Sequence, residues 1–176
     1  MTEEELKYPI GRFKFEGEIT EDMISKYIKD IVEVPGELKK AVEGLTDEQL
    51  STSYRPGGWN LKQVVHHIVD SHMNSYIRFK LALTEDEPQI KPYDEKKWAE
   101  LADSFVTPIS VSINLLENLH NSWADLLRSM SFKDFKRTYR HPVNGVSTLG
   151  RALALYSWHG KHHTAHITSL RKRMGW

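Results

Sequence analysis

Hydrophobic residues recur every three or four positions in four long stretches of the chain, which is the spacing of helices that bury one face. The first stretch follows Thr20, a residue type that caps helices, and ends near Gly44; we expect Pro35 to interrupt and kink it. Its apolar positions are Ile24, Tyr27, Ile28, Ile31, Leu38, Val42 and Leu45. Residues 1–19 precede it as an irregular N-terminal arm.

The second and third stretches have equally clear starting points. Asn60 followed by Gln63 forms a capping box for a helix that continues to about Thr84. Thr107-Pro108 begins the third helix, because proline is favoured in the first turn. Their apolar positions are Leu61, Val64, Val65, Ile68, Val69, Met73, Ile77 and Leu81 in the second, and Ile113, Leu116, Leu119, Trp123, Leu127 and Met130 in the third.

The fourth stretch begins at Ser147 or Thr148 and ends in three basic residues before Gly175, a favourable arrangement at a helix C-terminus. An Asn144-Gly145 pair just before it is typical of a tight hairpin turn, so any strand should be minor. The connections contain capping signals for short helices at residues 46–49 and after Asp94.

Four long amphipathic helices predict an all-α fold, a four-helix bundle with short extra helices and at most a minor hairpin. The chain has 176 residues, of which 39% are hydrophobic, so we expect residues 1–176 to form a single domain with a substantial core. We find no internal repeat and no low-complexity tract that would argue for a different organisation.

Charge and cysteine content narrow the function classes. The 24 basic and 24 acidic residues balance without long blocks of one sign, which argues against nucleic acid or an anionic membrane as a partner. The chain has no cysteine, so any thiol in its chemistry must arrive with a substrate. Without a signal-peptide pattern or an apolar run of about 18 residues, we expect a cytoplasmic protein that acts on small molecules.

The segment YSWHGKHHTAH in the fourth predicted helix carries the main chemical signal. His159 and His163 are four residues apart, so they lie one turn apart on the same face, where they interrupt an apolar stripe that should be buried. A buried polar pair needs a partner, and a divalent metal ion is a suitable one. His162 and His166 have the same spacing on a more mixed row, so we expect them nearer the surface or behind the ligands.

A third ligand should come from the second predicted helix, because bundles build metal sites from inward-facing side chains of neighbouring helices. Both His66 and His67 are candidates, and periodicity does not separate them. Isolated histidines on apolar faces are usually core residues. Here they cluster in two helices, and no HExxH, P-loop, GxSxG or CxxC pattern offers a rival site. A fourth ligand such as Asp70 would instead favour a closed, structural site.

Several segments resemble the YfiT-like subgroup of the DinB superfamily over nearly the whole chain: YPIG, GGWNLKQVVHHIVDSHMNSYIRFKLALTEDEP, PYDEKKWAEL, YRHP, WHGKHHTAH and RMGW. The resemblance implies a DinB-type four-helix bundle, usually homodimeric, with one divalent metal ion per chain bound by three histidines. Those ligands correspond to His67, His159 and His163, so the resemblance selects His67 over His66. Zinc and nickel both suit three imidazoles.

Three protein ligands leave a position open on the ion, which is the catalytic rather than the structural pattern. Such an ion can activate either a thiol or water. The superfamily includes thiol-dependent transferases, and the subgroup resembles bacillithiol S-transferases, although it usually carries the label of a metal-dependent hydrolase. Because the sequence shows no general base for hydrolysis, we expect an S-transferase that joins a low-molecular-weight thiol to an electrophile. A hydrolase and a non-catalytic metal-binding bundle are the alternatives.

Five further residues are candidates for orienting a substrate: Trp59, Asn74, Arg78, Arg151 and Tyr156. Core packing at a helix entrance is the simpler interpretation of Trp59, and an ordinary ion pair is an equal interpretation of Arg78.

Overall fold

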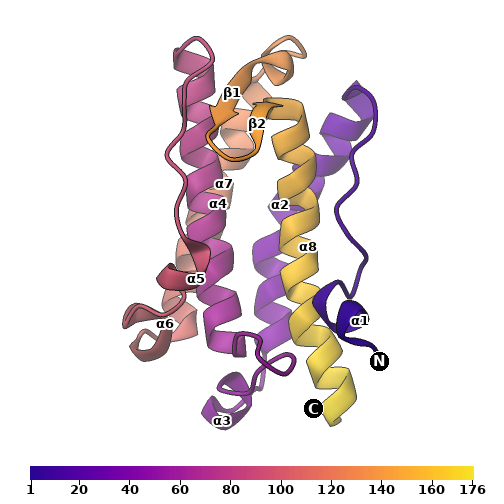
Figure 1. The fold of residues 1–176 in the computed structure, drawn as a ribbon, viewed down its shortest axis with the longest axis vertical. Coiled ribbons are helices and arrows are strands. Elements are labelled where there is room, and N and C mark those ends of the chain that lie inside the picture. Colours follow the sequence, from indigo (N-terminus) through magenta and orange to yellow (C-terminus); the bar gives the residue numbers. More distant parts are fainter.

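The computed structural model describes residues 1–176 as four long helices packed side by side with short helices around them (Figure 1). The long helices are α2 (Glu21–Val42), α4 (Leu61–Thr84), α7 (Ile109–Ser129) and α8 (Leu149–Met174). The short ones are α1 (Glu3–Lys7), α3 (Asp47–Leu50), α5 (Glu95–Trp98), α6 (Asp103–Val106) and the 3-10 helix η1 (Asp134–Lys136). The predicted all-α four-helix bundle is confirmed. None of the helices combines the length and the apolar character needed to cross a membrane.

Local capping accounts for where the long helices begin. The side chain of Thr20 accepts a backbone hydrogen bond from the first turn of α2, and Asn60 and Gln63 exchange both bonds of a capping box at α4. Thr148 caps α8 in the same way, and Gly175, with φ of +73°, ends it in a left-handed conformation. These starts and this end are the ones that the sequence predicts.

Three local expectations need correction. Helix α2 continues through Pro35 without interruption, because this proline is buried against the rest of the bundle. Pro108 is the N-cap residue of α7 and lies just before its first turn. The N-terminal arm contains α1, which starts at a capping box between Thr2 and Glu5, and α6 is a further short helix that the periodicity does not indicate.

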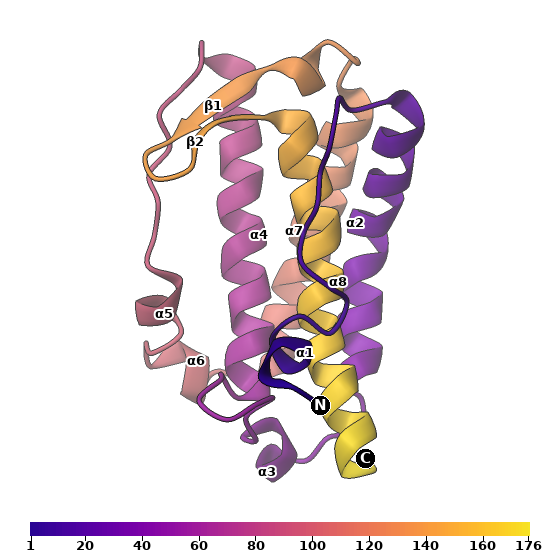
Figure 2. The ribbon, with the colours of Figure 1, turned by 45° about the vertical axis from the view of Figure 1, so that its right-hand side comes forward.

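The only sheet is a two-stranded antiparallel hairpin, β1 (Thr138–His141) and β2 (Gly145–Thr148), as expected. Gly145 has φ of +75°, which glycine adopts without strain. The hairpin lies between the upper ends of α4 and α8 (Figure 1). The N-terminal arm runs along the outside of α8 and brings α1 beside that helix (Figure 2).

The core is divided into two apolar clusters along the bundle axis. One contains Phe79, Trp123 and Tyr156, and the other contains Ile68 and Ile167. Histidines occupy the level between the clusters: His72 on α4 and His120 on α7 are buried, and His159 and His163 on α8 are half-buried. These four histidines therefore form a polar layer inside the bundle, between its two apolar clusters.

Candidate metal centre

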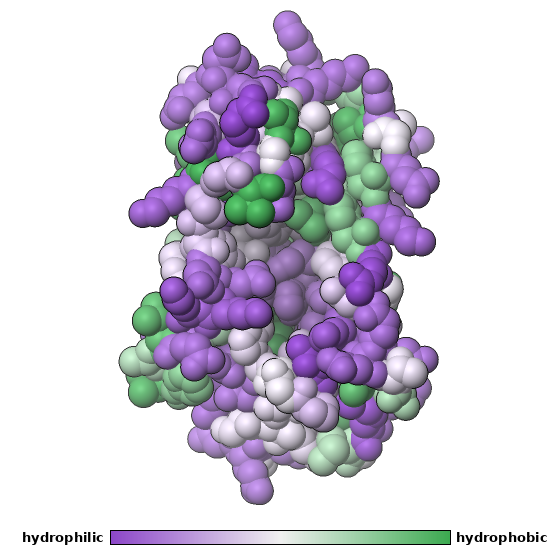
Figure 3. All heavy atoms as spheres, in the orientation of Figure 1, coloured by the Kyte–Doolittle hydropathy of each residue, from purple (hydrophilic) through white to green (hydrophobic).

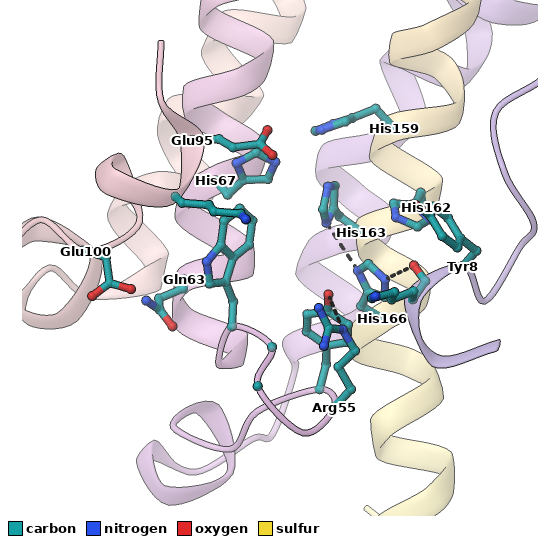
Figure 4. Close-up of a pocket in the computed structure, with 16 residues that line it drawn as sticks. Tyr8, Arg55, Gln63, His67, Glu95, Glu100, His159, His162, His163 and His166 are labelled. Carbon is teal, nitrogen blue, oxygen red and sulfur yellow. Dashed lines mark hydrogen bonds between the residues drawn. The ribbon is translucent and has the colours of Figure 1, made fainter. Parts of the chain in front are cut away.

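Three histidines converge between α4 and α8. His67 on α4 faces His159 and His163 on α8 (Figure 4), and each of the three offers a ring nitrogen that lies within 4.8 Å of the others. The ring centroid of His67 is 5.3 Å from that of His159 and 4.7 Å from that of His163. This spacing is compatible with a single metal ion between the rings.

The environment keeps these imidazoles neutral. Burial, reinforced by the neighbouring histidines, lowers the pKa of His67 to about 4. The same causes hold the pKa values of His159 and His163 well below the ordinary histidine range. Because only the neutral ring has a lone pair to give to a metal ion, all three side chains are ready to bind one near neutral pH.

The three rings line a cavity of about 680 Å³. A space-filling view shows a hollow in the face between α4 and α8, with hydrophilic residues at its floor (Figure 3). The cavity wall comes from both helices, the N-terminal arm, the loop before α4 and helix α5. Its charged residues are Lys7, Arg55, Glu95, Lys96 and Glu100. A small polar molecule can therefore reach the three nitrogens.

His66 points away from this cavity. Its Nδ1 atom lies 2.7 Å from Ser112 Oγ on α7, on the opposite side of α4 from His67. The direction of the two side chains thus distinguishes His66 from His67, which periodicity alone could not do. Both side chains are buried, but only His67 faces α8.

His162 and His166 are not near the surface, since both are buried beneath the N-terminal arm and the loop before α4. The ring of His162 stacks on Trp158, and that of His166 stacks on Tyr54. Together with His163 they form a second group of close ring nitrogens.

Hydrogen bonding argues against this second group as a metal site. His166 Nδ1 lies 3.3 Å from His163 Nδ1, and His166 Nε2 lies 3.0 Å from the Lys7 carbonyl oxygen. Because the Lys7 carbonyl can only accept, His166 Nε2 carries the proton of the neutral ring, and the lone pair on Nδ1 is directed at His163. His166 thus lies beside His163, and both residues line the cavity.

The further candidates divide between the cavity and other surroundings. Trp59 lines the cavity, with its ring 4.7 Å from that of His67, and Tyr156 packs 5.5 Å from His159. Asn74 donates a hydrogen bond to the backbone of its own helix, and the Arg151 guanidinium lies over the ring of Phe13 on the arm.

Two polar residues near the centre remain outside the three-histidine group. Arg78 is half-buried, and its charge acts on the hydroxyl of Tyr156. Burial raises the pKa of Asp70 to about 6, but its carboxylate does not join the close nitrogens. The three histidines thus have no carboxylate partner within their group.

Sequence reasoning missed two buried histidines and most of the cavity wall. His72 and His120 lie on apolar rows of their helices, so the periodicity of the sequence could have indicated that both are buried. Arg55, Glu95 and the arm reach the cavity through long-range packing, which leaves no periodic trace in the sequence.

Known proteins resemble this chain over almost its full length. The family model of the DinB superfamily matches residues 30–167. Proteins of Bacillus cereus (strain 03BB102) and Bacillus anthracis (strain CDC 684 / NRRL 3495), each named "Putative metal-dependent hydrolase", are 57% identical to it over 172 residues, which is 98% of this chain and 99% of theirs.

A solved structure has the same architecture. YfiT from Bacillus subtilis, described as a probable metal-dependent hydrolase with an unusual four-helix bundle topology, superimposes with a TM-score of 0.95 at 54% identity, and the match covers 98% of this chain and 99% of YfiT. The family match contains His67, His159 and His163. The chain therefore belongs to the DinB superfamily.

Proposed function

We propose that this protein is a metal-dependent enzyme in which His67, His159 and His163 bind one divalent ion, zinc or nickel. The donor set fits such an ion, because three neutral imidazoles offer nitrogen ligands of the type that both metals accept. No carboxylate lies within the group, and all three histidines line the cavity, so a small molecule there can reach the residues that would hold the ion. A bound ion would supply a Lewis acid that lowers the pKa of a nucleophile.

Hydrolysis of a small molecule is the reaction that we favour. The observation that carries this proposal is Glu95 of α5, a carboxylate that lines the same cavity as the three histidines. Glu95 lines the cavity together with His67, and Glu100 lies farther from the three histidines in the view of Figure 4. A carboxylate in this position can accept a proton from water as a general base. Glu95 belongs to no catalytic sequence motif, so the sequence alone showed no general base and favoured the transferase.

Thiol transfer is the second candidate. The cavity of about 680 Å³ falls in the upper part of the range of roughly 300–1,000 Å³ that ligand pockets occupy, and it has room for a thiol and an electrophile together. The cationic side chains of Lys7, Arg55 and Lys96 at its wall would suit a thiol that carries negative charge, such as bacillithiol. In this reaction the three-histidine site would favour the thiolate.

One experiment separates these functions. Metal-free, zinc-loaded and nickel-loaded protein would be incubated with a panel of esters and amides, and separately with bacillithiol and a simple electrophile. Metal-dependent hydrolysis without any thiol supports our first proposal. Conjugation that requires both the thiol and the metal would replace it with the second. Equal, background-level reaction in loaded and metal-free protein would leave a non-catalytic metal-binding bundle.

We also propose that residues 1–176 form one domain and that two chains pair as a homodimer in the cytoplasm. Apolar side chains on α6 and at the start of α7 support pairing, because Phe105, Val106 and Val111 are 46%, 76% and 52% exposed. Light scattering of the purified protein measures the assembly directly, and a monomer at all concentrations would contradict it.

A further inference from the structure

We propose that two chains of hydrogen-bonded histidines, each ending at a backbone carbonyl, fix which ring nitrogen of His159 and of His163 is free to bind the metal. The members of these chains are positioning residues. His72 and His120 lie outside the cavity lining, whereas His166 lines the cavity beside His163. The inference rests on the proposed ligand set, but it concerns the protonation pattern of the metal-free protein and can be tested without activity.

The first chain crosses the bundle from α2 to α8. His120 Nδ1 on α7 lies 2.6 Å from the carbonyl oxygen of Ile31. The other nitrogen of His120, Nε2, lies 2.9 Å from His72 Nδ1 on α4. His72 Nε2 in turn lies 3.2 Å from His159 Nδ1 on α8. Three helices and the backbone of the fourth are thus joined by three consecutive hydrogen bonds.

The order of donors along this chain follows from its end. A carbonyl oxygen can only accept, so His120 must carry its proton on Nδ1, and in the neutral ring Nε2 must accept. His72 must then donate from Nδ1 and accept at Nε2. His159 must donate from Nδ1, which leaves its Nε2 without a proton. That nitrogen lies 3.4 Å from the hydroxyl of Ser71, a group able to donate to it.

Pro35 explains why the Ile31 carbonyl is available. In a helix this oxygen would accept the backbone N–H of the residue four positions later, and that residue is Pro35, which has none. The proline therefore leaves an orphan acceptor inside α2, and the His120 ring satisfies it. A residue that is unfavourable for the helix thus provides the fixed end of the chain.

The second chain runs from α8 to the N-terminal arm. His166 Nε2 lies 3.0 Å from the Lys7 carbonyl oxygen, and His166 Nδ1 lies 3.3 Å from His163 Nδ1 (Figure 4). The same reasoning applies. His166 donates from Nε2 to the carbonyl and accepts at Nδ1, so His163 must donate from Nδ1. Its Nε2 is then the nitrogen without a proton.

Both ligands of α8 therefore present the same nitrogen, Nε2, to the cavity. A metal-binding histidine generally donates its other ring N–H to a fixed acceptor, which orients the ring and makes it a better ligand. Here the acceptors are other histidines, His72 and His166. His166 is bonded directly to a backbone carbonyl, and His72 is connected to one through His120. The third ligand, His67, has the Trp59 ring beside it and belongs to neither chain.

The protonation pattern can be read directly from nitrogen-15 spectra of histidine side chains in metal-free protein near neutral pH. We expect the proton on Nδ1 in His72, His120, His159 and His163, and on Nε2 in His166. A proton on Nε2 of His159 or His163 would overturn the proposal. This measurement needs no variant and no metal, so it can fail or succeed independently of the proposed enzymatic function.

Paired variants test whether the chain acts on the ligand. His120→Leu removes both the donor and the acceptor, whereas the amide of His120→Gln can still accept from His72 and donate to Ile31. We expect His120→Leu to weaken zinc binding by roughly 10- to 100-fold and to shift the His159 ring signals, and His120→Gln to restore most of both. His166→Leu and His166→Gln provide the same comparison for His163.

His66→Leu is the matched control, because His66 is also buried but bonds to Ser112 on α7 and belongs to neither chain. Zinc affinity, measured by competition with a chelator, should remain unchanged in this variant. Equal loss of affinity in His66→Leu and His120→Leu would mean that any core histidine matters, and it would contradict the proposal. Unchanged affinity and unchanged His159 signals in His120→Leu would contradict it as well.

Discussion

Gly160 of α8 lies directly against Val34 of α2, so close that a Cβ atom at position 160 would come within 2.5 Å of Val34 Cγ2. This close approach occurs between His159 and His163. It follows that the distance between α2 and α8 at the level of the metal centre depends on the absence of a side chain at Gly160. The backbone segment that carries both ligands is thus fixed by packing on its far side.

Gly160→Ala should therefore destabilise the protein, although alanine is normally better than glycine in a helix. We expect a loss of about 1–3 kcal/mol in the free energy of unfolding, because the methyl group would overpack the contact with Val34. Gly36→Ala on α2 is the control, since nothing lies within 4 Å of a Cβ there, and it should be neutral or stabilising by about 0.4–1 kcal/mol. Urea unfolding of both variants measures the difference, and equal effects would refute the packing argument.

Replacing a ligand should remove the metal. In His67→Ala, His159→Ala and His163→Ala we expect the loss of most bound zinc, as determined by elemental analysis after dialysis, because two imidazoles hold the ion far less tightly than three. His141→Ala serves as the control, since His141 lies on the hairpin and accepts hydrogen bonds from the turn. Full occupancy in the ligand variants would show that the metal binds elsewhere.

Acid should destabilise the metal-free protein, and the loss should begin near the pH at which ordinary histidines titrate. Burial lowers the pKa values of His67, His120 and His166 to about 4, whereas an exposed histidine in the unfolded chain titrates near about 6.5. Between these values the unfolded state binds more protons than the folded state, so the free energy of unfolding must fall as the pH falls.

Denaturant unfolding of metal-free protein at a series of pH values measures this effect. We expect stability to be nearly constant between about pH 7 and 8.5 and to decline steadily from about pH 6.5 towards 4. Constant stability down to about pH 5 would show that the buried histidines can be protonated without loss of structure.

If the protein is a hydrolase, Glu95→Gln should lower kcat by about 10²–10⁴-fold, the usual contribution of a general base, while zinc binding stays unchanged. Glu100→Gln alters the same cavity wall at a carboxylate farther from the ligands in the view of Figure 4 and should have little effect. Equal rates in wild-type and Glu95→Gln protein would remove Glu95 from the mechanism, whichever reaction the enzyme catalyses.

Features that depend on neighbours in the chain were predictable from the sequence. The caps at Thr20, Asn60 and Thr148 bond to residues only three positions away, so the local sequence is enough to predict where these helices start. The pairing of His159 with His163 follows from helix geometry in the same way. The four-helix bundle is confirmed because its apolar stripes are long and regular.

Features that depend on which helix faces which were not predictable in this way. His66 and His67 are both buried, since α4 packs against α7 on one side and α8 on the other, so periodicity could not tell them apart without the arrangement of the helices. Pro35 looked like an interruption because His120, which bonds to the Ile31 carbonyl that the proline leaves without a partner, lies far away in the sequence. Glu95 escaped notice because α5 is too short to produce a pattern.

The histidine chains end on the peptide backbone, at residues 7 and 31, and this choice of acceptor has an evolutionary consequence. Every amino acid has the same carbonyl group, so substitutions at Lys7 or Ile31 can accumulate without disturbing the proton arrangement, provided that the arm and α2 keep their paths. Selection on these two positions would act on conformation and would leave their side chains free to vary. An alignment of relatives would therefore display the histidines as invariant columns and give no sign of the groups that orient them.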